Sequence, residues 1–331
     1  MRLAVVLGSL CLWSVQTMAQ TETAPAEAQL RTQLPSQATA HPQSLKLRQS
    51  PAQLLPMPAI GIPATLEPLF ALQTSDVKFQ LPALMATLSD KRHEGWVLFA
   101  YPDPKTAEPL IGAGFTLDLP AREHPQGDSL NSHQFLEPSS AQLWQGAGLE
   151  PERLDRILAQ YNRNLEKWGK KKYRKQIKKQ QLPPDVTDEE AASLLQIAAV
   201  QAIHNARAYC RNFDQLTGSQ QMAVAQLVYQ MGVNLEGFTT FLSVINSRTP
   251  HLENASLTTA DSNDRQYWEA VQLSLIQSQW ARKYSTRAIS VIAMFDPDYM
   301  ENPSLAEKRV KVVLKPAKHK HKKTKSAKVK T

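Results

Sequence analysis

The spacing of apolar residues changes abruptly near residue 95, and this change restricts the fold more than any other feature of the sequence. Residues 81–94 carry leucine and methionine at helical spacing. The runs WVLFAY (96–101) and LIGAGFTLDL (110–119) are instead rich in strand formers, with a turn at 102–105 between them. We therefore expect a helix that ends near Gly95 and continues into a β-hairpin.

The remainder of the chain has helical patterns. Two capping boxes, at residues 187–190 and 217–220, predict helix starts, because a Thr side chain and a Glu or Gln three residues later satisfy free backbone N–H groups. Further amphipathic runs cover residues 150–168, 238–245, 267–279 and 287–295. One helix, a small hairpin and many helices predict the α+β class.

The N-terminus has the features of a signal peptide at residues 1–19. Arg2 precedes an apolar stretch at 3–15 that is too short to cross a bilayer, and Ala19 supplies the small residue before a cleavage site. We therefore expect an exported protein, periplasmic or secreted. The alternative is an uncleaved membrane anchor.

Composition divides the rest of the chain. Residues 20–78 are rich in Pro, Gln and Ala without a sustained period, which predicts a disordered linker. A folded domain is expected at 79–300, with a basic insertion at about 150–185, and a Lys-rich disordered tail at 301–331. We expect a monomer.

The net charge of +8 comes from two segments. Residues 163–180 hold nine Lys or Arg and one acid, and residues 308–331 hold eleven and none, which leaves 18 basic and 29 acidic residues elsewhere. We expect these segments to attract anionic envelope polymers or lipids. The alternative is ordinary solvated charge. Aromatic residues among cations also occur in nucleic-acid binders, but an exported chain predicts no specific nucleic-acid partner.

Cysteine usage excludes an internal disulfide. Only Cys11 and Cys210 are present, and Cys11 would leave with the signal peptide. Cys210 is expected to be a small buried residue and not a nucleophile.

Two carboxylates flank the first strand run. Acid/base cleavage of a glycoside requires a protonated carboxyl group at the glycosidic oxygen and a second carboxylate that stabilises positive charge or activates water. Glu94 and Asp103 could face each other in this way. By themselves they are weak evidence, because most surface carboxylates simply face solvent.

The surrounding residues resemble a family. His93-Glu94-Gly95-Trp96, Ala100-Tyr101-Pro102-Asp103 and Ile111-Gly112-Ala113-Gly114 look like the active-site segment of the phage-type lysozymes, glycoside hydrolase family 24. Downstream, the similarity continues through residues 227–232, 237–239, 278–280 and 286–288.

This resemblance implies a lysozyme-like fold, with a small lobe that carries the hairpin, a larger helical lobe and a cleft between them. It implies a muramidase that cleaves the β-1,4 bond between N-acetylmuramic acid and N-acetylglucosamine in peptidoglycan, without a metal or an organic cofactor. Two alternatives remain open: a lytic transglycosylase, and a non-catalytic peptidoglycan-binding protein of the same fold. An envelope-disrupting or nucleic-acid-binding protein led by the lysine tail is a third.

The resemblance also implies residue roles. Glu94 would be the general acid and Arg287 its ion-pair partner, although Arg287 could instead bind another acid. Asp103 would support charge at the reacting carbon. Gly112 and Gly114 would keep the cleft floor low, and Gln230 and Phe238 would touch substrate, whereas Tyr229 and Met231 are expected in the core.

One position departs from the family. The Thr that helps to hold the attacking water is here Leu110. In a regular strand, alternate residues project to one face, so Thr116 and Asp118 would point to the side of Leu110. We hypothesise that Thr116, with Asp118 behind it, replaces the missing group. Alternatively, both residues pair within the hairpin or cap the following turn.

Overall fold

The computed structural model describes residues 63–179, 182–248 and 257–314. The expected signal peptide, most of the expected linker and the end of the tail lie outside these residues. The helices are η2 (Ala64–Leu66), α2 (Glu67–Phe70), η3 (Thr74–Asp76), α3 (Leu81–Ser89), α4 (Ser140–Gly146), α5 (Pro151–Lys178), α6 (Asp188–Tyr209), η4 (Phe213–Gln215), α7 (Gly218–Met231), η5 (Gly232–Gly237), α8 (Thr239–Ile245), α9 (Leu257–Ile276), α10 (Gln279–Lys283), α11 (Ser285–Ala293) and α12 (Pro303–Leu314).

The fold also contains a small antiparallel sheet, so the α+β class is confirmed. Its strands are β1 (Val97–Pro102), β2 (Pro109–Gly112) and β3 (Phe115–Thr116), in that order across the sheet. The single strand expected at 110–119 is wrong. The chain reverses at residues 112–114, because Gly112 and Gly114 take positive φ angles of 61° and 83°.

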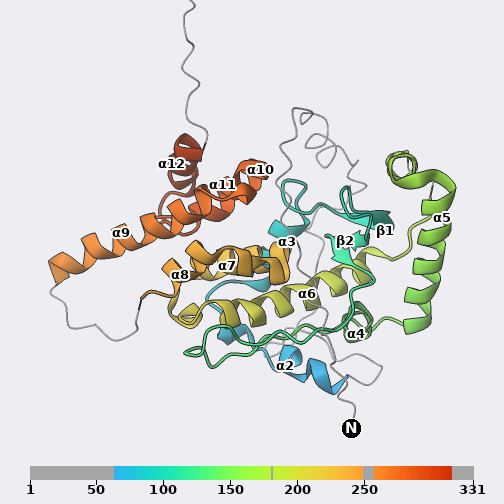
Figure 1. The fold of residues 1–331 in the computed structure, drawn as a ribbon, viewed down its shortest axis with the longest axis horizontal. Helices are drawn as coiled ribbons and strands as arrows, with labels where there is room; N and C mark the ends of the chain where they lie inside the picture. The colour runs from blue at the N-terminus through green and yellow to red at the C-terminus, as the bar shows by residue number, and fades with distance from the viewer. Residues whose placement is uncertain (1–62, 180–181, 249–256, 315–331) are drawn as a thin grey trace, which may run out of the picture. The chain divides into compact units, whose positions relative to one another are not determined.

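Helix α6 forms the centre of the fold. It crosses the middle of Figure 1, with α7 and β2 on one side and α2 and α4 on the other, and it contacts all four. Most of its residues are buried, and many of these are small or branched, such as Ala199, Val200 and Ile203. The capping boxes expected at Thr187 and Thr217 are confirmed, and they begin α6 and α7.

The first helix ends earlier than expected. Helix α3 stops at Ser89, and residues 90–94 form turns that bring the Glu94 backbone N–H to the Leu88 carbonyl at 3.1 Å. Gly95 has the predicted positive φ, 80°, but it turns the chain into β1 and does not close the helix.

Two segments expected to be disordered belong to the folded part. Leu66 and Leu69 are fully buried, in η2 and α2, and Leu66 packs beside Gly146 of α4, so order begins before residue 79. Helix α12 extends into the expected tail because Ala306 and Val310, four residues apart, bury one face against α9 and α11.

The basic insertion forms α5, which packs along β1. The Tyr173 hydroxyl donates a hydrogen bond to the Ala100 carbonyl of β1 at 2.9 Å, and Ile177 is buried beside it. At Gly169 the backbone is not helical, with φ 65° and ψ 161°, so α5 consists of two helical segments that meet at a kink. The expected helix at 150–168 is confirmed, and a second helical segment carries most of the basic residues.

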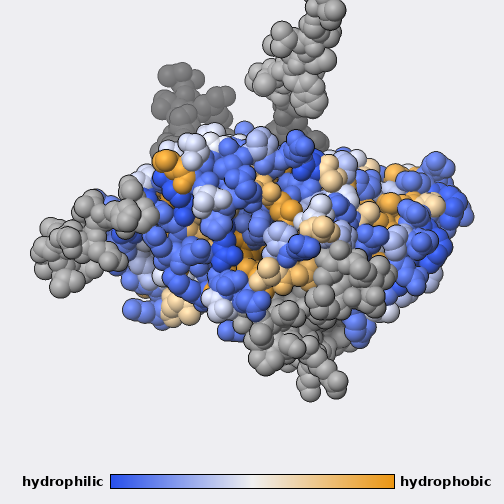
Figure 2. Space-filling view, turned by 90° about the horizontal axis from the view of Figure 1, so that it is seen from below, coloured by the Kyte–Doolittle hydropathy of each residue, from blue (hydrophilic) through white to orange (hydrophobic). Residues whose placement is uncertain are grey.

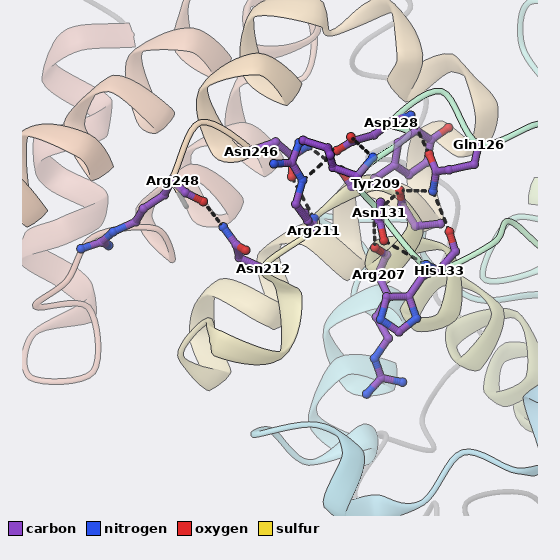
Figure 3. A network of polar contacts seen from close by, with 12 residues as sticks. Gln126, Asp128, Asn131, His133, Arg207, Tyr209, Arg211, Asn212, Asn246 and Arg248 are labelled. Atoms are coloured by element: carbon purple, nitrogen blue, oxygen red, sulfur yellow. Dashed lines mark hydrogen bonds and ion pairs between the residues drawn. The ribbon is translucent and has the colours of Figure 1, made fainter. Parts of the chain in front are cut away.

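The segment between β3 and α4, residues 120–139, has no regular structure but is fixed by side chains (Figure 3). Asn131 donates to the carbonyls of Arg207 and Ala208 at 2.8 Å each, and Gln126 donates to Ala208 at 3.0 Å. These amides satisfy carbonyl groups that the end of α6 leaves without helical partners. The Arg211–Asp128 ion pair, at 2.8 Å, adds a further link.

Figure 2 shows one face of the molecule, on which hydrophilic residues predominate and hydrophobic residues gather near the middle. Within the described ranges, none of the helices combines the length and the apolar character needed to cross a membrane.

Candidate active site

Glu94 lies in the chain between helix α3 and strand β1. It ends the turn after α3, and its side chain is 14% exposed. The predicted partner is confirmed: Arg287 of α11 donates from Nη1 to Glu94 Oε1 at 2.7 Å. Arg287 also donates from Nη2 to the carbonyl of His93, so one guanidinium binds both the carboxylate and the backbone that carries it.

Arg287 is itself held firmly. Its side chain is 6% exposed, and its guanidinium carbon lies 5.8 Å from the centre of the Tyr284 ring, in cation–π range. Because both ends of the Glu94–Arg287 pair are mostly removed from water, the carboxylate has little freedom to rotate.

His93 lies behind this pair as a buried, neutral imidazole. Burial, together with the positive charge of Arg287, lowers the pKa of His93 to about 4. Its Nε2 lies 3.5 Å from the hydroxyl of Ser290 in α11. The residue before the candidate acid thus contributes packing and no charge near neutral pH.

The second oxygen of Glu94 faces the glycine turn. A Cβ atom added to Gly114 would lie 3.3 Å from Glu94 Oε2, so only glycine leaves the carboxyl oxygen this much space. Gly112 has a different neighbour: a Cβ there would meet Ala191 of α6 at 3.8 Å. Gly114 therefore lies against the acid, whereas Gly112 is required by its positive φ and not by a lack of space, because 3.8 Å is an ordinary contact distance.

Tyr229 of α7 contacts the same glycine turn. Its hydroxyl donates to the Ala113 carbonyl at 3.0 Å, between the two glycines. Burial, and then the negative charge of Glu94, raise the pKa of Tyr229 well above its ordinary value. The phenol is therefore a permanent hydrogen-bond donor that fixes the β2–β3 turn beside Glu94.

A pocket of about 160 Å³ opens next to this turn. Its lining combines apolar side chains with a few polar ones, which is typical of small-molecule sites. The lining includes Gly114, Phe115, Thr116, Leu119, Arg122, Glu137, Ser140, Gln201, Asn205, Val228, Tyr229 and Gly232. Gly114 and Tyr229 belong both to the pocket and to the surroundings of Glu94.

Thr116 lines this pocket, for a reason that differs from the expected one. In the antiparallel register, Leu110 of β2 lies directly opposite Thr116 of β3. Residues directly opposite in such a pair project to the same face of the sheet. Thr116 therefore shares the face of Leu110, although the regular strand that was expected to achieve this is absent.

Asp118 lies beyond β3 and is exposed. Partial burial and the nearby charge of Glu108 raise its pKa. Asp118 and Asp103 both act on Tyr161 of α5, whose pKa rises because of burial, of Tyr173 and of these two carboxylates. Asp118 thus lies near Tyr161, as Asp103 does. It does not lie behind Thr116 in the pocket.

Asp103 stabilises the turn between β1 and β2. Its Oδ1 accepts hydrogen bonds from the backbone N–H groups of Lys105 at 2.7 Å and Thr106 at 3.0 Å. This turn also contacts α5, because Tyr161 donates to the Ala107 carbonyl at 2.5 Å. The side chain is partly exposed.

Gln230 and Phe238 meet at Trp280 of α10. Trp280 donates from Nε1 to Gln230 Oε1 at 3.1 Å, and its ring packs edge-to-face with Phe238 at a centroid distance of 6.5 Å. Both residues are half-buried. Gln230 follows Tyr229 in α7, so this cluster lies next to the residues that surround Glu94.

Three of the polar pocket residues that the sequence did not indicate contact one another. Glu137 Oε1 accepts from Asn205 Nδ2 at 2.9 Å, and Arg122 lies 3.6 Å from Glu137. Burial raises the pKa of Glu137, and Arg122 partly offsets this effect. Arg122 and Glu137 come from residues 120–139, which have neither a period nor a motif, so no sequence signal indicated them.

The described residues contain no group of three His, Cys, Asp or Glu side chains placed to hold a metal ion. Cys210 is buried, and burial raises its thiol pKa to about 12, so it is not a thiolate nucleophile near neutral pH. Comparisons with protein-family models, with curated proteins and with solved structures return no match.

Proposed function

We propose that this chain is a peptidoglycan hydrolase of the muramidase type, with a lysozyme-like fold and Glu94 as its general acid. One observation carries the proposal. The carboxyl group of Glu94 is held by Arg287 through Oε1, while Oε2 faces Gly114 at the edge of a pocket lined by polar and apolar side chains.

The two oxygens of Glu94 thereby have different tasks. Oε1 is anchored, and Oε2 is the oxygen that can carry a proton toward a sugar bound against the glycine turn. In acid/base cleavage this proton passes to the glycosidic oxygen as the bond to the sugar carbon breaks. Asp103 would supply negative charge for the positive charge that develops at that carbon.

Thr116 is the proposed water ligand. Its hydroxyl can both accept from and donate to a water molecule, whereas Leu110, opposite it, cannot. Hydrolysis needs this water. Because Thr116 of β3 would hold it in place of the residue at position 110 of β2, each step of the proposed muramidase reaction has a residue that serves it. Asp118, being exposed and grouped with Asp103, is left as a supporting charge.

The second candidate function is lytic transglycosylation, which Leu110 favours. In that reaction no water attacks, so an apolar residue at this position costs little. A non-catalytic peptidoglycan-binding protein is the third candidate. It would keep the pocket but would not need an arginine that anchors Glu94.

Product analysis separates these candidates. Purified peptidoglycan is digested with the wild-type protein and with Glu94→Gln, and the soluble products are weighed by mass spectrometry. We expect reducing-end muropeptides from the wild type and a strong loss in the variant. Products lighter by one water would indicate transglycosylation. No release, or equal release by both proteins, would contradict an enzymatic role for Glu94.

We also propose export, since Glu94 can meet peptidoglycan only outside the cytoplasmic membrane. The basic helix α5 would then attract anionic wall polymers, because Lys171, Lys172 and Lys175 are exposed and carry no described ion pair. Lys170 of this helix donates to the carbonyl of Lys105, in the turn that holds Asp103. The attraction would thus act close to the proposed site.

A further inference from the structure

Exposed apolar side chains are concentrated near the C-terminal end of the described chain. Seven large hydrophobic side chains are exposed within the described residues, and four of them lie between residues 300 and 313. These four are Met300, Leu305, Val312 and Val313, which are 75%, 44%, 63% and 54% exposed. Isolated exposed hydrophobic residues are ordinary, but a local group of this kind indicates a contact surface.

Helix α12 presents three of these residues to solvent. Leu305 and Val312 are seven residues apart, so they lie above one another on a side of the helix that packing leaves free. The buried positions, Ala306 and Val310, lie on the neighbouring side, toward α9 and α11, and Val313, seven residues after Ala306, is exposed at the end of that packed side. Packing within the described part of the chain therefore does not account for the exposed stripe.

Cations accompany this stripe. Lys308 and Lys311 are exposed on α12. Arg309 is neutralised by Asp296, with 2.6 Å between Nη2 and Oδ2, so it contributes no free charge. The chain then continues through residues 315–331, which contain eight lysines and no acid. Apolar and positively charged groups thus occur together over a short length of chain.

We propose that α12, with the lysines that follow it, binds the surface of an anionic lipid bilayer. The lysines match the negative headgroups, and Leu305, Val312 and Val313 enter the boundary between headgroups and acyl chains. A soluble polyanion or a nucleic acid would attract the same lysines but would gain nothing from the exposed apolar residues. The inference goes beyond the proposed function, because lipid is not the substrate of a muramidase.

The test compares three full-length proteins: wild type, the triple variant Leu305→Gln, Val312→Thr, Val313→Thr, and the control Leu130→Gln. Leu130 is 73% exposed but lies in the 120–139 segment, away from α12 in the sequence. The exchanges keep side-chain size and helix propensity close to the original. Because all three proteins share one N-terminus, its own affinity for lipid cancels in the comparison.

Binding is measured by co-sedimentation with vesicles of equal parts phosphatidylglycerol and phosphatidylcholine at 150 mM salt. We expect the triple variant to lose at least tenfold in partitioning, and the Leu130 control to bind as the wild type does. Vesicles of phosphatidylcholine alone should bind all three weakly. Equal binding by the triple variant, or no binding by the wild type, would overturn the proposal.

Two further measurements exclude other occupants. Retention on an anionic polysaccharide column should be equal for the wild type and the triple variant; a loss there would overturn the proposal by indicating a polymer site. A wild-type dimer in light scattering that the triple variant abolishes would also overturn it, because the face would then bind a second copy. Release of muropeptides should be unchanged in the triple variant, so failure of this inference and failure of the muramidase proposal are distinguishable.

Discussion

Arg287 binds Glu94 across 193 positions of sequence, with 2.7 Å between Nη1 and Oε1. The same guanidinium binds the backbone carbonyl of His93. Helix α11 is thereby joined to the turn that precedes the sheet. The pair thus has two consequences: it orients the candidate acid, and it connects two parts of the fold.

Removing Arg287 should be costly for stability. In Arg287→Ala, the mostly buried carboxylate of Glu94 and the carbonyl of His93 both lose a donor. We expect the free energy of unfolding to fall by about 3 kcal/mol, as is usual when one member of a buried pair is removed. The measurement is urea denaturation at pH 7.

The matched control is Arg265→Ala, which breaks the ion pair with Asp298. Both side chains are exposed, at 51% and 38%, so we expect a loss of less than about 1 kcal/mol. Similar losses in the two variants would show that the Glu94–Arg287 pair has no special structural weight.

Gly114 and Gly112 provide a test of the geometry at the acid. Both have positive φ, so Gly114→Ala and Gly112→Ala should each lose about 1 kcal/mol of stability. Only the Gly114 variant places a methyl group against Glu94 Oε2. Its rate of peptidoglycan cleavage should therefore fall at least tenfold more than that of the Gly112 variant. Equal rates would mean that the turn does not border the reacting groups.

Asp103 allows its charge and its turn role to be separated. In Asp103→Asn, Oδ1 can still accept from Lys105 and Thr106, so stability should fall less than in Asp103→Ala. The negative charge is lost, and we expect cleavage to slow by about 100-fold. Asp103→Ala should lose both stability and activity. Full activity in the Asn variant would remove Asp103 from the proposed chemistry.

His93 should make the protein less stable in mild acid. Its pKa is lowered from 6.5 to about 4 in the folded state, so between these values the unfolded chain binds the extra proton. Stability is therefore fully present above pH 6.5 and falls as the pH decreases toward 4. The His93 contribution amounts to about 3 kcal/mol at most.

The check is the difference in unfolding free energy between wild type and His93→Gln, measured from pH 4 to pH 7. Taking the difference removes the contributions of other titrating groups, such as Glu137. The wild type should lose stability faster than the variant as the pH falls. Parallel curves would show that the imidazole is not buried in its neutral form.

Local signals in the sequence predicted most of the elements around the site. The capping residues Thr187 and Thr217 marked helix starts correctly, because capping depends on neighbours three residues away. The strand residues of β1 also act locally, whereas the reversal of the chain at Gly112 and Gly114 was not predicted. The Glu94–Arg287 pair is a long-range contact, and only the resemblance to a family predicted it.

The features that were missed depend on contacts distant in sequence. Leu66 is ordered because it packs beside Gly146, and nothing near Leu66 indicates this contact. Arg122 and Glu137 reach the pocket because Asn131 and Gln126 bind the end of α6. Helix α12 was not predicted, because its two buried residues give only a weak helical pattern and the segment that follows is rich in lysine.

The most direct test of the central claim is the rate of peptidoglycan cleavage by Glu94→Gln beside that of Asp90→Asn. The glutamine keeps the shape of the side chain and an oxygen for Arg287 but cannot donate the proton, whereas Asp90 is a nearby carboxylate that binds Arg92. We predict that the Glu94 variant loses activity at least about 1,000-fold while remaining folded, and that the Asp90 variant stays near wild type. Equal rates for wild type and Glu94→Gln would contradict the account.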